Sequence, residues 1–448
     1  MKKNIFFLTI DGLRADKFEG NDKSSITPNL DSLRKKGSYF SQGISCADGT
    51  TLSLNAIFTS KFPFRTGTRA KEVYMDSSNF IHVLKNNGYH IYGVIPDLTS
   101  LSRFRFSFEN NVNSFRGTPP NIEHMWEGTG KKILNLFEKD KMRKPWFCYI
   151  HPMDLHDPLV VPEEFNDEKF GKSKYEKILS SIDEWIGQTI KKIDFSNTLI
   201  ILTADHGSII PEGDVGYTDL EPEMKTELKI GKKIMPKSTH KFGAKMIMGV
   251  KNRIRDSRLK QANKGLTAYQ IRSRLSHTTL LLNEEIVHVP LIFAGVGTPK
   301  NKIIPELVRT VDIFPTILDI IDIDYSILED RDGRSLVPMF EDKKLPELPA
   351  YFNTIAHKEI TLDDKVGIRT SKYKYFRHLN DQEKEINLYD LENDPQENIN
   401  IASENPDIVK EMEKILEDFT KNSVTEEEKL TEEEEKIVEA QLKDLGYI

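Results

Sequence analysis

The sequence has few cysteines and no long hydrophobic run. Its 448 residues include two cysteines, which cannot build a disulfide framework, so we expect a reducing, cytoplasmic setting. No apolar stretch reaches the length of a membrane-spanning helix. The short apolar run in the opening MKKNIFFLTI meets Asp11 without a cleavage site of small residues. We therefore expect neither a signal peptide nor a membrane anchor, and interpret the opening as a buried strand.

Acidic residues are scarce in one segment of an otherwise acidic chain. Residues 225–274 contain fifteen Lys and Arg and two acids, although the formal net charge of the whole chain is −7. Such segregated charge favours an anionic partner, either a polyanionic chain or a membrane surface contacted peripherally, and we expect no nucleic acid. Within this segment FGAKMIMGVKNRI has apolar residues at four-residue spacing, typical of a basic amphipathic helix. A solvated insertion over about residues 220–275, packed on the main domain, is the alternative.

The composition is that of a folded α/β protein. Apolar residues make up 38% of the chain and charged residues 30%, which excludes a disordered chain and a membrane protein. The length suits a large domain and a smaller one. From about residue 345 the pattern changes to short strands, turns and charged helices, and IRTSKYKYF alternates like an antiparallel strand. We predict a larger domain over residues 1–344 and a C-terminal α+β subdomain over residues 345–448.

Strand-like and helical patterns alternate in the larger domain. Short buried strands are predicted for NIFFLTI, HIYGVI, WFCYIH, TLIILTA and VPLIFAG. Amphipathic helices are predicted for NLDSLRKKG and KYEKILSSIDEWIGQTIKKI. Fully apolar strands separated by helices indicate a largely parallel sheet with both faces covered.

Three predicted strands end in side chains that bind metals or move protons. Ligands of such sheets bind beyond the carboxyl ends of the strands, so these side chains predict a metal or catalytic centre there. Asp205 could instead cap the following helix, with an incidental histidine after it. The residues that follow the three strands are Asp11, the pair Asp205 and His206, and the group His151, Asp154 and His156.

Two adjacent threonines open an apolar helical run. Residues 47–63 read ADGTTLSLNAIFTSKFP, and no acid follows Asp48 in this stretch. The hydroxyls of Thr50 and Thr51 could cap the helix, or one of them could be a nucleophile. The two interpretations are compatible, because a helix N-terminus also favours an anionic group.

The ordered series of motifs resembles the sulfatase branch of the alkaline phosphatase superfamily. This resemblance implies an alkaline-phosphatase-like mixed, mostly parallel sheet between helices, a smaller C-terminal α+β subdomain, and a metal-dependent esterase or transferase. The matching stretches are NIFFLTIDGLRAD, TPNLDSLRKKGSYF, TSKFPFRTG, HPMDLHDPLVVP, LTADHG, EEIVHVPLIFAG, VDIFPTILDI, DGRSLVP and NLYDLENDPQENINIA.

The resemblance places Thr50 at the nucleophile position. True sulfatases have there a Cys or Ser that is oxidised to formylglycine within a Cys-x-Pro-x-Arg core. The corresponding stretch here is TTLSL, and CADGT around Cys46 also lacks the Pro and the Arg. We therefore expect Cys46 to be a packed residue and Thr50 to act unmodified, as in the phosphate-handling members of the superfamily.

Two further departures from the sulfatase pattern point the same way. Pro96 and Asp97 occupy the region where sulfatases carry a Lys and a His that hold the sulfate, and Gly12 replaces a second metal-binding Asp. The remaining metal-ligand positions resemble those of two enzyme groups that bind a single metal ion. These are the phosphonate ester hydrolases and the transferases that build glycerophosphate polymers. We predict one divalent ion, Mn, Zn or Mg rather than Ca, because one ligand is an imidazole. The predicted ligands are Asp11, Thr50, Asp205 and His206.

The resemblance also assigns two catalytic histidines. His156, in HDP, matches the residue that protonates the leaving group, although a solvent-facing loop histidine is the alternative. We expect Asp154 to orient His156 or to cap a turn. His277, in SHTTLLLNEE, aligns with a family histidine near the substrate.

The resulting functional prediction is a metal-dependent hydrolase or transferase that cleaves phosphate, phosphonate or sulfate esters through a covalent threonine intermediate. One alternative is a true sulfatase. Others are a phosphoglycerol- or phosphoethanolamine-type transferase acting on a glycan or lipid, and a catalytically silent binding protein that keeps the fold.

Overall fold

The protein is seen in a computed structural model that describes much of the chain outside the basic segment. The contacts divide the chain into one unit of residues 1–208 and 280–448, and a second unit of residues 209–279. The described residues are 2–68, 73, 79–110, 114–118, 121–139, 141–210, 253–254, 257–273, 281–324, 326, 330–354 and 364–421.

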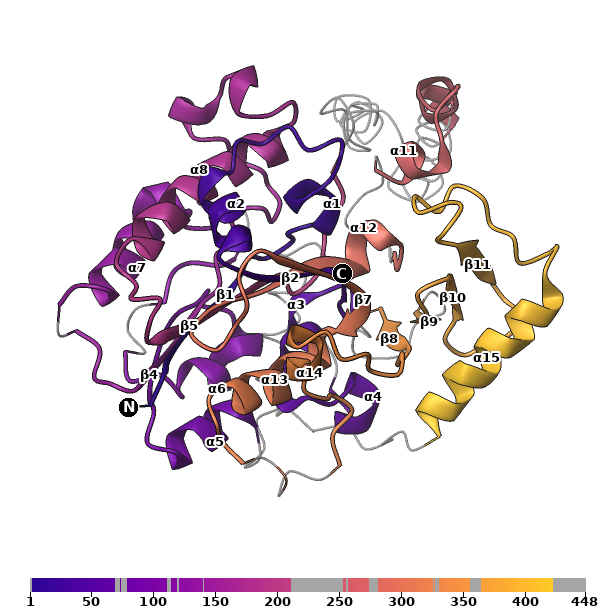
Figure 1. The fold of residues 1–448 in the computed structure, drawn as a ribbon. Coiled ribbons are helices and arrows are strands. Elements are labelled where there is room, and N and C mark those ends of the chain that lie inside the picture. Colours follow the sequence, from indigo (N-terminus) through magenta and orange to yellow (C-terminus); the bar gives the residue numbers. More distant parts are fainter. Residues whose placement is uncertain are drawn as a thin grey trace, which may run out of the picture. The chain divides into compact units, whose positions relative to one another are not determined.

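A central sheet organises the first unit (Figure 1). Among the described residues its strand order is β3-β4-β1-β5-β6-β2-β7. Every pairing is parallel except those of β6 with β5 and with β2. The strands are β1 (Asn4–Thr9), β2 (Gly37–Ile44), β3 (His90–Val94), β4 (Trp146–Ile150), β5 (Thr198–Thr203), β6 (His288–Gly295) and β7 (Lys302–Arg309).

The sequence pattern explains the middle of this sheet. The central strands β1, β4 and β5 are buried along their whole length, as expected of apolar strands covered on both faces. In the register, Leu8 of β1 lies opposite Ile150 of β4, and Thr9 lies opposite Thr203 of β5. The predicted mixed, mostly parallel sheet between helices is confirmed.

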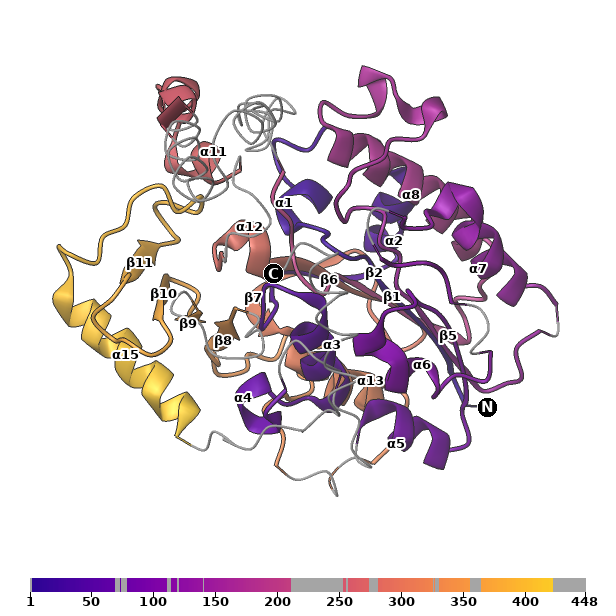
Figure 2. The same ribbon diagram turned by 180° about the vertical axis from the view of Figure 1, so that it is seen from behind.

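Helices cover both faces of the sheet (Figures 1 and 2). The group α2, α7 and α8 lies over one face, while α3, α5, α6 and α13 lie over the other. The two helices predicted from amphipathic spacing are confirmed as α2 and α8, and the Ser173 side chain caps α8. The helices are α1 (Ala15–Phe18), α2 (Pro28–Lys35), α3 (Thr50–Thr59), α4 (Pro63–Thr66), α5 (Phe80–Asn86), α6 (Ser102–Arg105), α7 (Gly130–Leu136), α8 (Lys174–Ile190), α12 (Glu284–Val287), α13 (Ile313–Ile320) and α14 (Val337–Phe340).

A smaller antiparallel sheet follows near the C-terminus, with the order β11-β10-β9-β8 in the described residues. The stretch IRTSKYKYF, expected as one strand, instead spans the end of β9, a turn and the start of β10. The expected boundary near residue 345 stays a prediction. The elements are β8 (Ala350–Asn353), β9 (Lys365–Arg369), β10 (Tyr373–His378), β11 (Asn387–Asp390) and α15 (Pro406–Thr420).

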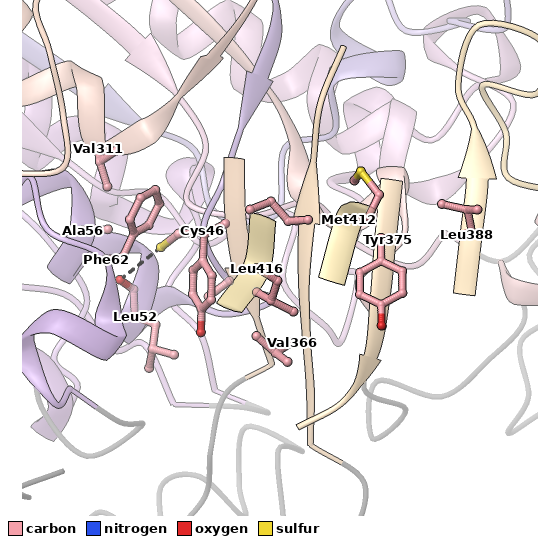
Figure 3. Close-up of a cluster of buried hydrophobic side chains, with 13 residues drawn as sticks. Cys46, Leu52, Ala56, Phe62, Val311, Val366, Tyr375, Leu388, Met412 and Leu416 are labelled. Carbon is pink, nitrogen blue, oxygen red and sulfur yellow. Dashed lines mark hydrogen bonds between the residues drawn. The ribbon is translucent and has the colours of Figure 1, made fainter. Parts of the chain in front are cut away.

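A hydrophobic cluster joins the small sheet to the rest of its unit. Figure 3 shows Leu52 and Phe62 from the region of α3 and α4 in one cluster with Tyr375 of β10 and Leu416 of α15. The two parts of this unit therefore share a core.

The second unit is described only in part. Its helix α11 (Ala268–Arg272) begins with a capping box, in which Thr267 Oγ1 accepts from the Gln270 amide and Gln270 Oε1 accepts from the Thr267 amide. His277 and most of the predicted helix FGAKMIMGVKNRI lie outside the described residues. None of the described helices is long and apolar enough to cross a membrane.

Candidate active site and metal centre

The strand order brings three side chains to one point at the edge of the sheet. Because β4, β1 and β5 are parallel neighbours, their carboxyl ends lie side by side, and Asp11, His151 and Asp205 follow them. A hydrogen bond of 3.1 Å from the Asp11 amide to the Pro152 carbonyl ties two of these chain segments together. One ligand atom of each of the three residues lies within 4.8 Å of the others. All three side chains are buried.

Thr50 reaches the same point from the end of β2, which runs in the same direction as β1, β4 and β5 but is separated from β5 by the antiparallel β6. It is the first residue of α3, a helix whose ten residues are all buried. Its hydroxyl Oγ1 donates a hydrogen bond of 3.1 Å to Asp11 Oδ2 and lies 3.5 Å from His206 Nε2. A hydroxyl at a helix N-terminus sits where negative charge is stabilised by the free backbone amides.

The imidazole of His206 has a defined tautomer. Its Nδ1 lies 2.6 Å from the carbonyl oxygen of Gly207, which can only accept, so Nδ1–H is the donor and, in the neutral imidazole, Nε2 carries the lone pair. Nε2 lies 3.5 Å from Asp205 Oδ2. Burial lowers the pKa of His206, but the charges of Asp205 and Asp11 outweigh it and raise that pKa above its ordinary value.

Gly207 explains why this loop packs so closely. A Cβ at this position would lie 2.0 Å from the Glu285 carbonyl oxygen, so only glycine fits. Its amide donates to the Ile286 carbonyl at 2.6 Å, which fixes the loop of His206 against α12.

A buried ionic cluster anchors α12 in turn. Lys374 of β10, which is fully buried, lies 3.1 Å from Glu284 and 3.0 Å from Glu397. Arg369 of β9 binds both oxygens of Glu284, at 3.0 and 3.1 Å. Burial alone would raise the pKa of Glu284, but the charges of Arg369 and Lys374 lower it below its ordinary value. The C-terminal sheet thus supports the loop of His206 through α12.

The carboxylates fit a divalent cation. Asp11 Oδ1 and Asp205 Oδ2 are buried and have no hydrogen-bond partner in the described part of the chain. The other oxygen of Asp205 accepts from the amides of His206 at 2.9 Å and Gly12 at 3.3 Å, so Oδ2 is turned toward the centre. A buried carboxylate oxygen without a donor is costly, and a bound cation removes that cost.

Neighbouring groups keep Asp11 charged. Burial raises its pKa, but the hydrogen bond with His151 and the charges of His206 and His156 hold the pKa well below its ordinary value. An ionised carboxylate is the form that binds a metal.

The structure therefore brings together the four predicted ligands Asp11, Thr50, Asp205 and His206. Their role as metal ligands stays a prediction. His151 was not among the predicted metal ligands, although it follows a strand-like run in the sequence, as Asp11 also does. Gly12, at the position of the absent second acid, has a φ of +69°, a backbone conformation in which glycine is favoured.

The predicted proton donor His156 is half-buried beside this centre. Its Nδ1–H donates to the Asp157 carbonyl at 2.8 Å, which leaves Nε2 as the nitrogen that can exchange a proton. Its charge acts on Asp11, so it is within electrostatic range of the carboxylates.

Asp154 caps the segment Met125–Thr129. Its Oδ1 accepts from the Met125 amide at 2.8 Å and lies 3.9 Å from His124 Nδ1. This contact agrees with the expected capping role. Asp154 Oδ2 and His124 Nδ1 have no hydrogen-bond partner among the described residues. Burial raises the pKa of Asp154 to about 7, although the Met125 amide opposes this.

Asp154 should therefore make stability fall as the pH rises. A raised carboxyl pKa gives stability that is fully present below the unfolded-state pKa of 3.8 and is lost as pH rises through about 7. Asp154→Asn does not titrate, so relative to the wild type its unfolding free energy should gain on the order of 4 kcal/mol at most over this pH window. Thermal unfolding of both proteins at pH 5 and pH 8 measures the change. If the difference in stability between the two proteins is the same at pH 5 and pH 8, the raised pKa of Asp154 is contradicted.

Cys46 is a packed residue. It is buried in the hydrophobic cluster of Figure 3, with Sγ 3.7 Å from the Leu52 carbonyl oxygen. Burial raises the pKa of its thiol well above the ordinary value, so little reactive thiolate forms.

Comparison with known families agrees with this fold. A family model described as Sulfatase matches residues 3–323, well over half of the chain. The chain belongs to the sulfatase family. A second model, described as the C-terminal part of N-sulphoglucosamine sulphohydrolase, matches residues 278–422. Enzymes of this family are metal-dependent.

Individual relatives of this sulfatase-family chain are distant. Arylsulfatase K of Gallus gallus is 31% identical to this chain over 135 residues. The match covers 29% of this chain and only 25% of the length of that relative. A solved 2-O GAG sulfatase has a TM-score of 0.63 at 16% identity, covering 94% of this chain and 93% of its own. The phosphonate monoester hydrolase of Silicibacter pomeroyi has a TM-score of 0.64 at 14% identity, covering 94% and 96%. At such identities the structural likeness shows the shared fold.

Proposed function

We propose that this sulfatase-family hydrolase cleaves phosphate or phosphonate esters, with Thr50 as an unmodified nucleophile and one divalent ion held beside it. The observation that carries this proposal is the position of Thr50 Oγ1, 3.1 Å from Asp11 Oδ2 at the N-terminus of a buried helix. A divalent ion bound by Asp11, Thr50, Asp205 and His206 would lower the pKa of the hydroxyl and neutralise charge on the attacked group.

The attack begins with the proton of Thr50. The hydroxyl donates to Asp11 Oδ2, which is placed to accept its proton as Thr50 attacks, while Nε2 of His206 lies 3.5 Å from the same oxygen and would bind the ion. The oxygen of Thr50 then bonds to phosphorus as the bond from phosphorus to the leaving oxygen breaks, in line. The product is a phosphothreonine ester.

His156 supports departure of the alcohol. With Nδ1–H bound to the Asp157 carbonyl, a protonated His156 has one transferable proton, on Nε2, which passes to the leaving alkoxide. Water then attacks the threonine ester and restores Thr50, and another alcohol in place of water would make the enzyme a transferase. His277, the second predicted catalytic histidine, lies outside the described residues.

Sulfate ester hydrolysis is the second candidate. The match to the sulfatase family and the likeness to arylsulfatase K favour it. Against it stand TTLSL at the nucleophile position and CADGT around the buried Cys46, neither of which has the Cys-x-Pro-x-Arg core that formylglycine formation needs. Asp11 Oδ1 and Asp205 Oδ2 have no hydrogen-bond donor among the described residues, and the Thr50 hydroxyl lies against Asp11. Both features argue against a catalytically silent binding protein.

We expect phosphate or phosphonate ester cleavage to exceed sulfate ester cleavage by at least about tenfold in kcat/KM. The physical reason is the nucleophile, together with Pro96 and Asp97 in the region where a true sulfatase holds sulfate with Lys and His. The measurement compares p-nitrophenyl phosphate, bis(p-nitrophenyl) phosphate, p-nitrophenyl phenylphosphonate and p-nitrophenyl sulfate, which share one leaving group. A far higher rate on the sulfate would reverse the assignment.

The basic segment 225–274 is proposed to select the substrate. Its excess of Lys and Arg suits a glycan- or lipid-linked anionic ester, or a membrane surface carrying one. Most of the segment lies outside the described residues, so the sequence alone supports this part of the proposal.

A further inference from the structure

His151 is the buried polar side chain at the centre that the proposed chemistry has not used. The residue is fully buried, and its Nε2 lies 3.3 Å from Asp11 Oδ2 and 3.8 Å from Asp205 Oδ2. Its other ring nitrogen, Nδ1, lies 2.8 Å from the hydroxyl of Tyr149, two residues earlier on β4. The imidazole is therefore held between a tyrosine on one side and two carboxylates on the other.

We propose that His151 binds the divalent ion through Nε2, and that Tyr149 is the positioning residue that sets its tautomer. This inference rests on the metal-dependent function proposed above. It adds an imidazole ligand from β4 to the predicted set, at a centre where Gly12 supplies no second acid. Two imidazoles and two carboxylates suit Zn or Mn better than Ca.

The spacing of the ligand atoms supports this assignment. Five contacts among these side chains measure between 3.1 Å, from Thr50 Oγ1 to Asp11 Oδ2, and 3.8 Å, from His151 Nε2 to Asp205 Oδ2, and the ligand atoms of Asp11, His151 and Asp205 lie within 4.8 Å of one another. Bonds of about 2.0–2.2 Å to zinc in tetrahedral geometry would place neighbouring ligand atoms about 3.3–3.6 Å apart. These five contacts are thus close to the separation of neighbouring ligand atoms around one ion.

The hydroxyl of Tyr149 can serve either tautomer of His151. Without an ion, the hydroxyl donates to Nδ1 and Nε2–H donates to Asp11 Oδ2. With an ion, Nε2 must offer its lone pair, so the proton moves to Nδ1 and the hydroxyl becomes the acceptor. A side chain that could only donate would oppose metal binding.

Tyr149→Phe isolates this role with little effect on packing. The ring of Tyr149 packs edge-on against Phe7, Phe58 and Phe104, with centroids 5.4, 5.2 and 5.3 Å away, and phenylalanine keeps those contacts. Tyr89→Phe is the matched control. Tyr89 is also buried and loses one hydrogen bond, to the Lys3 carbonyl at 2.9 Å, at the opposite end of the strands.

The test is titration calorimetry of the metal-free full chain with Zn²⁺ alone and with Mg²⁺ alone. Tyr149→Phe should weaken Zn²⁺ binding by about 10–100-fold, the usual effect of removing a partner of a metal-bound histidine. His151→Gln should weaken Zn²⁺ binding at least as much and Mg²⁺ binding less, because Mg²⁺ prefers oxygen ligands. Tyr89→Phe should bind both ions as the wild type does.

A second measurement does not depend on a variant that folds. In ¹⁵N-histidine-labelled wild type, Zn²⁺ should convert the His151 signal to the tautomer protonated at Nδ1. Unchanged Zn²⁺ affinity in both His151→Gln and Tyr149→Phe, or an unchanged His151 signal on zinc binding, would overturn the inference. A wild type that binds neither ion would overturn the proposed function instead, so the two failures are distinct.

Discussion

Replacing Thr50 with alanine should lower kcat/KM on a phosphate or phosphonate ester by roughly four to six orders of magnitude, the range seen when a covalent nucleophile is removed. Thr50 Oγ1 is the hydroxyl that lies against Asp11 and His206, and no covalent ester can form without it. Thr50→Ser, which keeps a hydroxyl on the same helix turn, should retain a substantial part of the activity. Steady-state rates measure both effects.

Thr51→Ala is the matched control for this prediction. Thr51 is the next residue of α3 and is buried to a similar degree, 6% exposed against 8% for Thr50. It should lose little activity, because the hydroxyl that faces the carboxylates is that of Thr50. If Thr51→Ala is inactive while Thr50→Ala is active, the nucleophile has been placed one residue too early.

Asp205→Asn should remove the bound metal and the activity together. Oδ1 of Asp205 is held by the amides of Gly12 and His206, while the buried Oδ2 faces the centre without a hydrogen-bond donor. Asparagine keeps the shape but loses the charge, so we expect metal affinity to fall by at least about 100-fold. Elemental analysis of the purified variant, beside its kcat/KM, measures both changes.

The exposed Asp194 provides the control for Asp205→Asn. Asp194 accepts from the Ser196 amide at 3.0 Å in a surface turn, so Asp194→Asn changes the same functional group away from the site. It should keep metal and activity. Full activity in a metal-free Asp205→Asn protein would exclude a metal-dependent mechanism that uses this carboxylate.

The sequence predicted the middle of the sheet better than its edge. The strands β1, β3, β4, β5 and β6 are short apolar runs with clear ends, so periodicity found all five. It missed β2 and β7. Glycine and serine interrupt the apolar residues of β2, which also contains a bulge, and β7 is an edge strand that contains Pro305 and Glu306. Strands of this kind are defined by their neighbours, which a sequence window does not contain.

The hairpin in the C-terminal sheet was missed for a related reason. Alternation in IRTSKYKYF continues through the turn, where the Thr370 amide donates to the Tyr373 carbonyl at 2.9 Å and Thr370 Oγ1 accepts from the Tyr373 amide at 2.9 Å. A side chain that satisfies the backbone in a turn leaves no break in the hydrophobic pattern.

The side chains of the candidate site were named from the sequence, and their roles stay predictions. Position at strand ends and the resemblance together identified Asp11, Thr50, Asp205 and His206, which the fold brings together. His151 could have been included from the strand end alone. The strand order, which makes β4 a direct neighbour of β1, decides that its imidazole meets the two carboxylates, and no local pattern encodes that order.

The most direct test of the central claim is to trap the covalent intermediate on Thr50. The wild type is mixed with a fast phosphate or phosphonate ester, quenched in acid and digested, and the peptides are analysed by mass spectrometry. The account predicts an unmodified, unoxidised Thr50 in the resting enzyme, a transferred phosphoryl or phosphonyl group on that residue after quenching, and no adduct in Thr50→Ala. An adduct on another residue, or an oxidised side chain at the nucleophile position, would contradict it.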